Sequence, residues 1–309
     1  NVDGIGFSTC DKIANQNGIS IDSEKRIEAG ILYVLENARE QGNVYMTKDE
    51  LVNEMYRTLK LTSGINFDDS LYNLEINMKI KRNMMNDVEF IFLKSAYNIE
   101  KNLSEILYNK KDDITIITGG PGTGKTYNIK KYLNEALEKG LKVALCTPTG
   151  RAAKRVQEVT NYEARTIHRL LECVGDRENN KVYFSRNEDN KLDIDLLIVD
   201  EMSMVDEYLM YALMKATPDM TAIILVGDVD QLPSVGAGQV LKDMITSNLF
   251  NVMKLEKIYR QEDGSNIVMN AHMVNEGMAV DVKEKHEDFI FTHKNTDEGV
   301  RDAIKILMS

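Results

Sequence analysis

The stretch that decides the fold is Gly119-Gly120-Pro121-Gly122-Thr123-Gly124-Lys125-Thr126. It follows the short apolar run Ile114–Ile117 and precedes a helical pattern from Tyr127 to Lys139. A glycine-rich turn between a strand and a helix lets backbone N–H groups surround phosphate oxygens, and the positive end of the helix adds to the attraction. The pattern and its context together predict a phosphate-binding loop.

This loop predicts a binding site for ATP and Mg²⁺. Lys125 is expected to reach the β- and γ-phosphates, and the Thr126 hydroxyl is expected to coordinate Mg²⁺. The residues expected to contact the nucleotide are Gly120, Pro121, Gly122, Thr123, Gly124, Lys125 and Thr126. The alternative is a glycine-rich turn that holds no ligand.

Polar residues follow two further apolar runs. Asp200 and Glu201 come directly after Leu196–Val199, and Gln231 lies in the segment after Ile223–Val226. The carboxyl ends of parallel strands meet at the ligand-binding edge of a sheet. Asp200 is expected to hold Mg²⁺, Glu201 to activate the attacking water, and Gln231 to contact the γ-phosphate. Solvated acids and a polar surface turn are the alternatives.

The chain changes character near residue 112. Beyond it, strands alternate with helices, which indicates an α/β fold with a parallel sheet covered on both faces. The expected strands are 114–117, 142–146, 196–199 and 223–226, and the expected helices are 127–139, 150–159 and 206–216. The polar segment 176–193 is predicted to be a surface excursion.

The region before residue 112 is predicted to be mostly helical. Helices are expected at 23–39, 47–61, 68–81 and 95–108, with a strand at 88–93. Thr47 and Glu50 form a capping-box pattern at the start of the second of these helices. Two helices followed by a hairpin would give a winged-helix-like unit.

Composition limits the function. The 309 residues carry a net charge of -11, so a uniformly basic nucleic-acid coat is excluded, although a local basic groove is not. The segment 142–171 holds six basic and two acidic residues. Three scattered cysteines and the lack of any long apolar run predict a protein of the reducing cytoplasm with no membrane partner.

Three cations in this basic segment have helical spacing. Arg151, Lys154 and Arg155 lie at i, i+3 and i+4, so they are expected to share one helix face that binds DNA. The helix N-terminus at Thr149-Gly150 is suited to a phosphate. A solvated basic face is the alternative. Taken alone, Arg260 is expected to be a surface or ion-paired arginine.

An ordered set of segments resembles the superfamily-one DNA helicases, and within them the RecD-like branch, which moves 5′ to 3′ on single-stranded DNA. The matching segments are GGPGTGKT (119–126), CTPTGRAAKR (146–155), TIHRLL (166–171), LLIVDEMSMVD (196–206), LVGDVDQLPSVGAGQVLKD (225–243) and LEKIYRQ (255–261). The resemblance implies a RecA-like motor domain.

The resemblance also implies residue roles. Lys125 and Glu201 keep the roles given above, Gln231 becomes the γ-phosphate sensor, and Arg260 becomes an arginine finger. Pro148, Thr149 and Gly150 match residues that touch the DNA backbone. Thr166 and His168 match a segment near the strand.

The N-terminus resembles the second half of a helix-hairpin-helix. In that motif a Gly-Ile-Gly turn, here Gly4 to Gly6, offers backbone N–H groups to a DNA phosphate without reading bases. The alternative is a tight glycine turn that opens a helix, with Ser8 as its cap.

The chain departs from the family pattern at three places. No glutamine lies between Gln41 and Gln157, so the adenine-recognising residue before the phosphate loop is missing, and Tyr127 replaces a second threonine. The sequence stops at Ser309, before the last motifs, so it is expected to be a piece of a longer protein. The predicted domains are 1–111, 112–254 and 255–309.

The prediction is therefore an ATP- and Mg²⁺-dependent DNA helicase motor that acts on single-stranded DNA and duplex junctions in repair or recombination. Its protein partners are unknown. Two alternatives stay open at this point. One is an ATPase that remodels or loads DNA without unwinding it, and the other is a non-catalytic DNA-binding scaffold.

Overall fold

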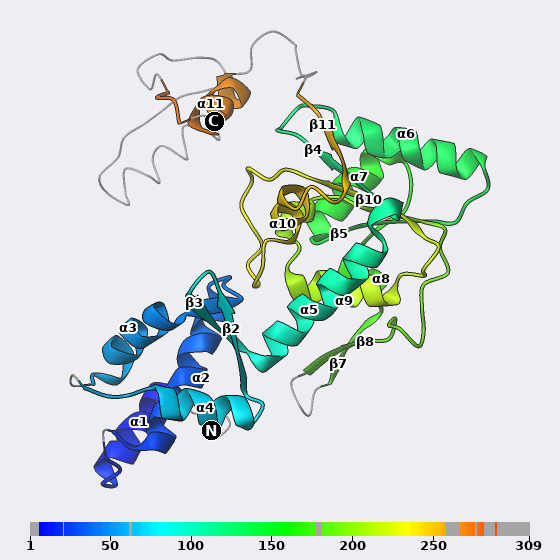
Figure 1. Ribbon diagram of the computed structural model, residues 1–309. Helices are drawn as coiled ribbons and strands as arrows, with labels where there is room; N and C mark the ends of the chain where they lie inside the picture. Colours follow the sequence, from blue (N-terminus) through cyan, green and yellow to red (C-terminus); the bar gives the residue numbers. More distant parts are fainter. Residues whose placement is uncertain are drawn as a thin grey trace.

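The computed structural model describes residues 6–20, 22–61, 64–176, 181–256, 266–275, 277–280 and 288 (Figure 1). An N-terminal group of helices with a small sheet leads into a larger α/β unit, called the motor unit below. None of the helices in these ranges is long and apolar enough to cross a membrane.

The N-terminal unit contains the predicted winged-helix-like arrangement. Its elements are α1 (Phe7–Gln16), α2 (Glu24–Glu40), β1 (Tyr45–Thr47), α3 (Lys48–Leu59), α4 (Asp68–Ile76), β2 (Ile80–Met85) and β3 (Val88–Leu93). Two helices, α3 and α4, precede an antiparallel hairpin, and β1 completes a sheet of order β1-β3-β2. The Thr47 side chain accepts a hydrogen bond from the Glu50 N–H, and the Glu50 carboxylate accepts one from the Thr47 N–H, so the predicted capping box is confirmed.

The helix predicted over 68–81 was too long. Helix α4 ends at Ile76, Met78 has a left-handed backbone with φ of 56°, and Ile80 begins β2. Pairing with β3 buries Ile80 opposite Leu93, which the local helical pattern could not indicate. The hairpin turns at Asn86 and Asp87, both of which have positive φ as this tight turn requires.

The motor unit is built on a six-stranded, all-parallel sheet of order β11-β4-β10-β9-β5-β6, which confirms the predicted α/β class. Its strands are β4 (Ile114–Thr118), β5 (Val143–Thr147), β6 (Ala164–Thr166), β9 (Leu196–Val199), β10 (Ala222–Gly227) and β11 (Asn251–Lys254). Its helices are α5 (Lys94–Asn109), α6 (Lys125–Glu138), α7 (Gly150–Thr160), α8 (Ile167–Leu170), α9 (Glu207–Ala216) and α10 (Val240–Thr246). Helix α11 (Asn266–Asn275) follows later in the chain.

Helices cover both faces of the sheet. Successive strand residues point to opposite faces, so both sets of side chains are buried. Leu197 and Val199 pack into the core beneath α5 and α9, whereas Leu196 and Ile198 pack into the core beneath α6 and α7. Unbroken apolar strands are the sequence signature of this arrangement. Strands β7 (Cys173–Asp176) and β8 (Lys181–Phe184) pair antiparallel. The segment 176–193, predicted as a polar excursion, therefore includes the last residue of β7 and all of β8.

The N-terminal unit touches the loop between β10 and α10, which also carries Gln231. The Gly238 N–H donates a 3.2 Å hydrogen bond to the Gly42 carbonyl.

Glu207, at the start of α9, is a buried carboxyl group that is 1% exposed. Burial together with the adjacent Glu100 carboxyl of α5 raises the pKa of Glu207 to about 8. Burial also raises the pKa of Glu100.

This carboxyl pair predicts a pH-dependent stability. The folded chain holds protons that the unfolded chain releases near pH 4.5, so the stability that Glu207 contributes is complete below that pH and is lost as the pH rises toward 8. Between pH 5.5 and 8.5, wild type should lose about 1–3 kcal/mol more unfolding free energy than Glu207→Gln. Urea unfolding across this range measures the difference. The exposed-site variant Glu138→Gln should behave as wild type, and parallel curves for wild type and Glu207→Gln would contradict the expectation.

Candidate functional site

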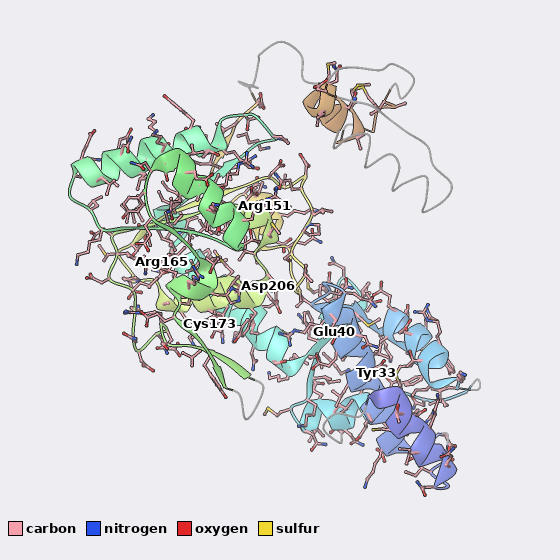
Figure 2. The ribbon with its side chains drawn as sticks, turned by 180° about the vertical axis from the view of Figure 1, so that it is seen from behind. Tyr33, Glu40, Arg151, Arg165, Cys173 and Asp206 are labelled. Atoms are coloured by element: carbon pink, nitrogen blue, oxygen red, sulfur yellow. The ribbon has the colours of Figure 1, made fainter. Side chains whose placement is uncertain are left out.

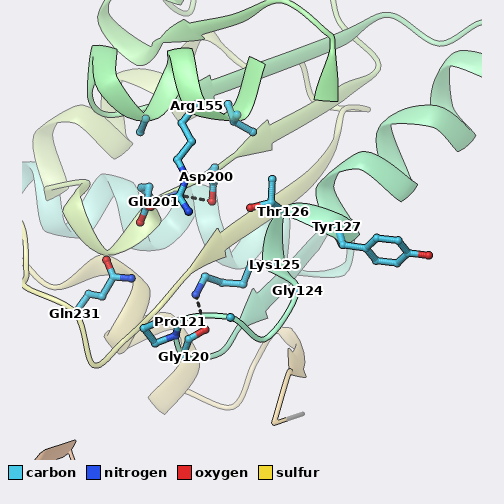
Figure 3. A pocket seen from close by; sticks show the side chains of 13 residues that line it. Gly120, Pro121, Gly124, Lys125, Thr126, Tyr127, Arg155, Asp200, Glu201 and Gln231 are labelled. Carbon is cyan, nitrogen blue, oxygen red and sulfur yellow. Dashed lines mark hydrogen bonds between the residues drawn. The ribbon is translucent and has the colours of Figure 1, made fainter. Parts of the chain in front are cut away.

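The loops that follow β4, β9 and β10 meet at one edge of the sheet and enclose a pocket of about 350 Å³ (Figure 3). Side chains of α6 and α7 close two of its sides. The pocket is lined by Gly120, Pro121, Gly122, Gly124, Lys125, Thr126, Tyr127, Ala152, Arg155, Val156, Asp200, Glu201 and Gln231. The structure thus brings together the loop, the two acids and the glutamine that lie far apart in sequence.

Glycine is required at specific points of the loop. Gly122 and Gly124 have φ of 80° and 88°, a region that other residues rarely adopt. A Cβ atom on Gly119 would lie 2.6 Å from the Leu255 carbonyl oxygen. The chain then enters the 14-residue helix α6 at Lys125, whose free N–H groups provide a site for an anion.

Lys125 lies inside this loop. Its Nζ atom donates to the carbonyl oxygens of Gly119 and Gly120, the latter at 3.0 Å, and lies 3.9 Å from an oxygen of Asp228 (Figure 3). The side chain is only 14% exposed. The ammonium group is therefore held beside the loop, where phosphate oxygens would bind, and not in open solvent.

Asp200 and Glu201 leave β9 in two different environments. The Asp200 carboxylate accepts a 2.9 Å hydrogen bond from the Glu201 N–H, and burial raises the pKa of Asp200 to about 6 despite that bond and the nearby cations of Lys125 and Arg155. Glu201 has a left-handed backbone with φ of 54°. Its buried Oε2 atom has no hydrogen-bond partner among the described residues, while the side chain as a whole lines the pocket.

The oxygen atoms of Thr126 and Asp200 suit Mg²⁺, which prefers hard oxygen ligands. Within the described ranges, no group of three His, Cys, Asp or Glu side chains forms a metal cage. At phosphate sites Mg²⁺ keeps several waters and is bound by one or two protein oxygens together with substrate phosphates.

Asp228 is a site residue that sequence reasoning did not single out. It is 2% exposed, and its carboxylate lies between Lys125 Nζ at 3.9 Å and Gln231 Nε2, which donates at 3.3 Å. Asp228 thus connects the phosphate loop to the predicted sensor. Its position as the first charged residue after an apolar parallel strand, the same context as Asp200, was the available signal.

The structure also gathers the predicted DNA-binding loops. Thr147 and Thr166 pair across β5 and β6, so the segment 148–150 lies beside 166–168 at the same sheet edge. The hydroxyls of Thr149 and Thr166 accept hydrogen bonds from the N–H groups of Ala152 and Arg169, so each caps its own helix. His168 is exposed, with its ring 5.8 Å from that of Phe184.

The three cations expected on one face of α7 separate into two sets. All three side chains are exposed, but Arg155 lines the pocket, whereas Arg151 and Lys154 do not. Figure 2 shows Arg151 on α7, with Arg165 on the neighbouring strand β6. The three cations thus share the exposed side of α7 as predicted, and Arg155 lies where that side meets the pocket.

Two predicted residues, Gly4 and Arg260, lie outside the described residues. Gly6 is exposed at the start of α1, where its carbonyl accepts from the Thr9 and Cys10 N–H groups. The roles of the DNA-contacting residues and the predicted domain boundaries stay predictions.

Two family models match the chain, each over a different region, and known proteins match it over longer stretches. A family model described as "ATP-dependent RecD2 DNA helicase HHH domain" matches residues 1–45, and one described as "AAA domain" matches residues 104–237. The ATP-dependent RecD2 DNA helicase of Deinococcus radiodurans is 30% identical over 327 residues, which cover 90% of this chain and 44% of that protein. The RecBCD enzyme subunit RecD of Mycolicibacterium smegmatis is 38% identical over 155 residues, 43% of this chain and 27% of that protein.

Among solved structures, the Pif1 helicase from Candida albicans aligns with a TM-score of 0.41 and 21% identity, covering 59% of this chain and 44% of that one. The chain spans less than half the length of the two curated relatives described above. The N-terminal match, the match over the phosphate loop and its sheet, and the similarity to these relatives agree with one another. Together these matches show that the chain is RecD-like, related in sequence to the RecD2 and RecD helicases.

Proposed function

We propose that the chain is the nucleotide-binding part of an ATP- and Mg²⁺-dependent DNA helicase that moves 5′ to 3′ along single-stranded DNA and unwinds duplexes in repair or recombination. The observation that carries the proposal is the single pocket in which the phosphate loop, Asp200, Glu201 and Gln231 meet. The printed names of the relatives, an ATP-dependent RecD2 DNA helicase among them, support the same function.

In this proposal the loop 119–126 and Lys125 bind the phosphates of ATP. Thr126 and Asp200 hold Mg²⁺, which neutralises phosphate charge when bound. Glu201 orients the attacking water and accepts its proton through its carboxylate, which lines the pocket. Gln231, held by Asp228, contacts the γ-phosphate, and Arg260 supplies the arginine finger.

The DNA track is proposed to follow the sheet edge beside the pocket. Backbone N–H groups at the start of α7 and the cations Arg151 and Lys154 bind the phosphates of the strand. Thr166 and His168 lie beside them on the next strand and helix. Single-stranded DNA and duplex junctions are therefore the proposed partners, together with proteins of the repair machinery.

Two other functions make different predictions. An ATPase that loads or remodels DNA would hydrolyse ATP without separating strands. A DNA-binding scaffold would never hydrolyse ATP, and the intact set of Lys125, Thr126, Asp200 and Glu201 disfavours it.

The test is strand separation by the full-length protein on duplexes with a 5′ or a 3′ single-stranded tail. We expect ATP-dependent unwinding of the 5′-tailed duplex only. Hydrolysis without unwinding of either duplex would favour the loading ATPase. No hydrolysis under any condition would favour the scaffold.

The proposed track predicts a change in salt dependence. Arg151→Glu combined with Lys154→Glu should weaken binding of an oligothymidine and reduce the slope of log affinity against log salt by about 1 to 1.5, because each lost phosphate contact on a single strand removes about 0.7. Fluorescence anisotropy over a salt series measures this. The matched control reverses Lys130 and Lys131, which are exposed on α6. An equal slope in wild type and the α7 variant would remove this helix from the track.

A further inference from the structure

The pocket is lined by a cation, Arg155, that belongs neither to the phosphate loop nor to the loops that follow β9 and β10. Arg155 lies on α7, five residues after Gly150, the first residue of a helix whose N-terminus is proposed to bind DNA. It lines the pocket together with Ala152 and Val156. These three residues have spacing i, i+3 and i+4, so they form one stripe along the helix, and that stripe faces the nucleotide pocket.

Figure 3 shows how the arginine enters the site. Its side chain extends from α7 into the pocket and ends beside Asp200 and Glu201. The positive charge of Arg155 acts against the rise in the pKa of the buried Asp200. Arg155 is thus within electrostatic range of Asp200.

The position also indicates which end of a nucleotide Arg155 would meet. Lys125, Asp200, Glu201 and Gln231 surround the part of the pocket where the terminal phosphate is proposed to lie. Tyr127 lies on the opposite side of Thr126, further along α6, and its ring points away from the acids. Arg155 is on the side of the acids.

We propose that Arg155 is a ligand for the terminal phosphate of bound ATP and not for DNA. This inference rests on the proposed nucleotide site. A planar guanidinium can donate two parallel hydrogen bonds to phosphate oxygens, which a lysine at the same position cannot do.

Helix α7 carries residues of both proposed sites. Helix α7 has eleven residues, with a proposed DNA phosphate site at its N-terminus and Arg155 five residues further on. A contact made by Arg155 only in the ATP state biases the position of the same helix that holds the DNA. Thermodynamic linkage then requires that ATP alter DNA affinity and that DNA alter ATP affinity by the same factor.

The test compares binding of two nucleotides to this chain by titration calorimetry with Mg²⁺ present. Arg155→Gln is expected to weaken a non-hydrolysable ATP analogue about 10- to 100-fold, the loss of a charged hydrogen-bonding group, and ADP by less than about 3-fold. Arg155→Lys should fall between wild type and Arg155→Gln. A merely structural role would weaken ADP and the ATP analogue equally, and that result would overturn the proposal.

The matched control is Lys154→Gln, a neighbouring exposed cation on the same helix that does not line the pocket. It should leave both nucleotide affinities unchanged and weaken oligothymidine binding measured without nucleotide, whereas Arg155→Gln should leave that DNA affinity unchanged. The reverse pattern would return Arg155 to the DNA face and overturn the proposal. Wild type that binds no ATP analogue would overturn the nucleotide site itself, and with it this inference. Wild-type binding that Arg155→Gln does not alter would overturn the inference alone.

Discussion

Lys125→Ala is expected to abolish ATP turnover by the complete protein, with a loss of at least about 100-fold in kcat/KM. The Lys125 ammonium is held against the loop carbonyls and 3.9 Å from Asp228, so it is placed at the site of the β- and γ-phosphates. Removing it leaves the phosphate charge without its nearest cation. Steady-state release of phosphate in the presence of oligothymidine measures the effect.

The control for this variant is Lys130→Ala, which removes an exposed lysine from the same helix, α6. It should retain wild-type turnover. Circular dichroism establishes whether Lys125→Ala keeps its secondary structure, which we expect because, in the part of the chain that the structure describes, the polar contacts of this side chain are with the loop and Asp228. Turnover by folded Lys125→Ala at the wild-type rate would contradict the assignment of the phosphate loop.

Glu201→Gln is expected to bind ATP as wild type does and to hydrolyse it about 10² to 10⁴ times more slowly. The amide has nearly the same shape as the carboxylate but cannot accept the proton of the attacking water. The structural reason to separate this role from binding is that the Glu201 carboxylate lines the pocket, whereas the phosphate loop and Lys125 supply the proposed phosphate contacts. Single-turnover hydrolysis and equilibrium binding of an ATP analogue measure the two effects independently.

Glu135→Gln is the matched control for Glu201→Gln, since it makes the same chemical change on the exposed face of α6. It should leave binding and hydrolysis unchanged. If Glu201→Gln lost binding and hydrolysis by the same factor, Glu201 would have a structural role, for which its left-handed backbone would be the natural explanation.

Most of the motor unit was predictable because its local signals agree with one another. The apolar strands Ile114–Ile117, Leu196–Val199 and Ile223–Val226 each precede a polar or glycine-rich loop, and the parallel-sheet rule then places those loops at one edge. The pocket formed by the phosphate loop, Asp200, Glu201 and Gln231 follows from that rule. The capping box at Thr47 was also predictable, because it is encoded within four residues.

Other features depend on partners far away in the sequence. The first two residues of β2, Ile80 and Lys81, were predicted to end a helix, because only pairing with β3 makes them part of a strand. Helical spacing correctly grouped Arg155 with Arg151 and Lys154 on α7. That spacing could not indicate that the nucleotide pocket lies beside α7 and is lined by Arg155. The role of Asp228 depends on its burial between Lys125 and Gln231, which no local pattern encodes.

The most direct test of the account is equilibrium binding of a fluorescent, non-hydrolysable ATP analogue to this chain with Mg²⁺. We predict saturable binding at one site per chain, displaced by unlabelled ATP and lost in Lys125→Ala. A wild-type chain that is folded by circular dichroism and yet shows no saturable binding would contradict the account.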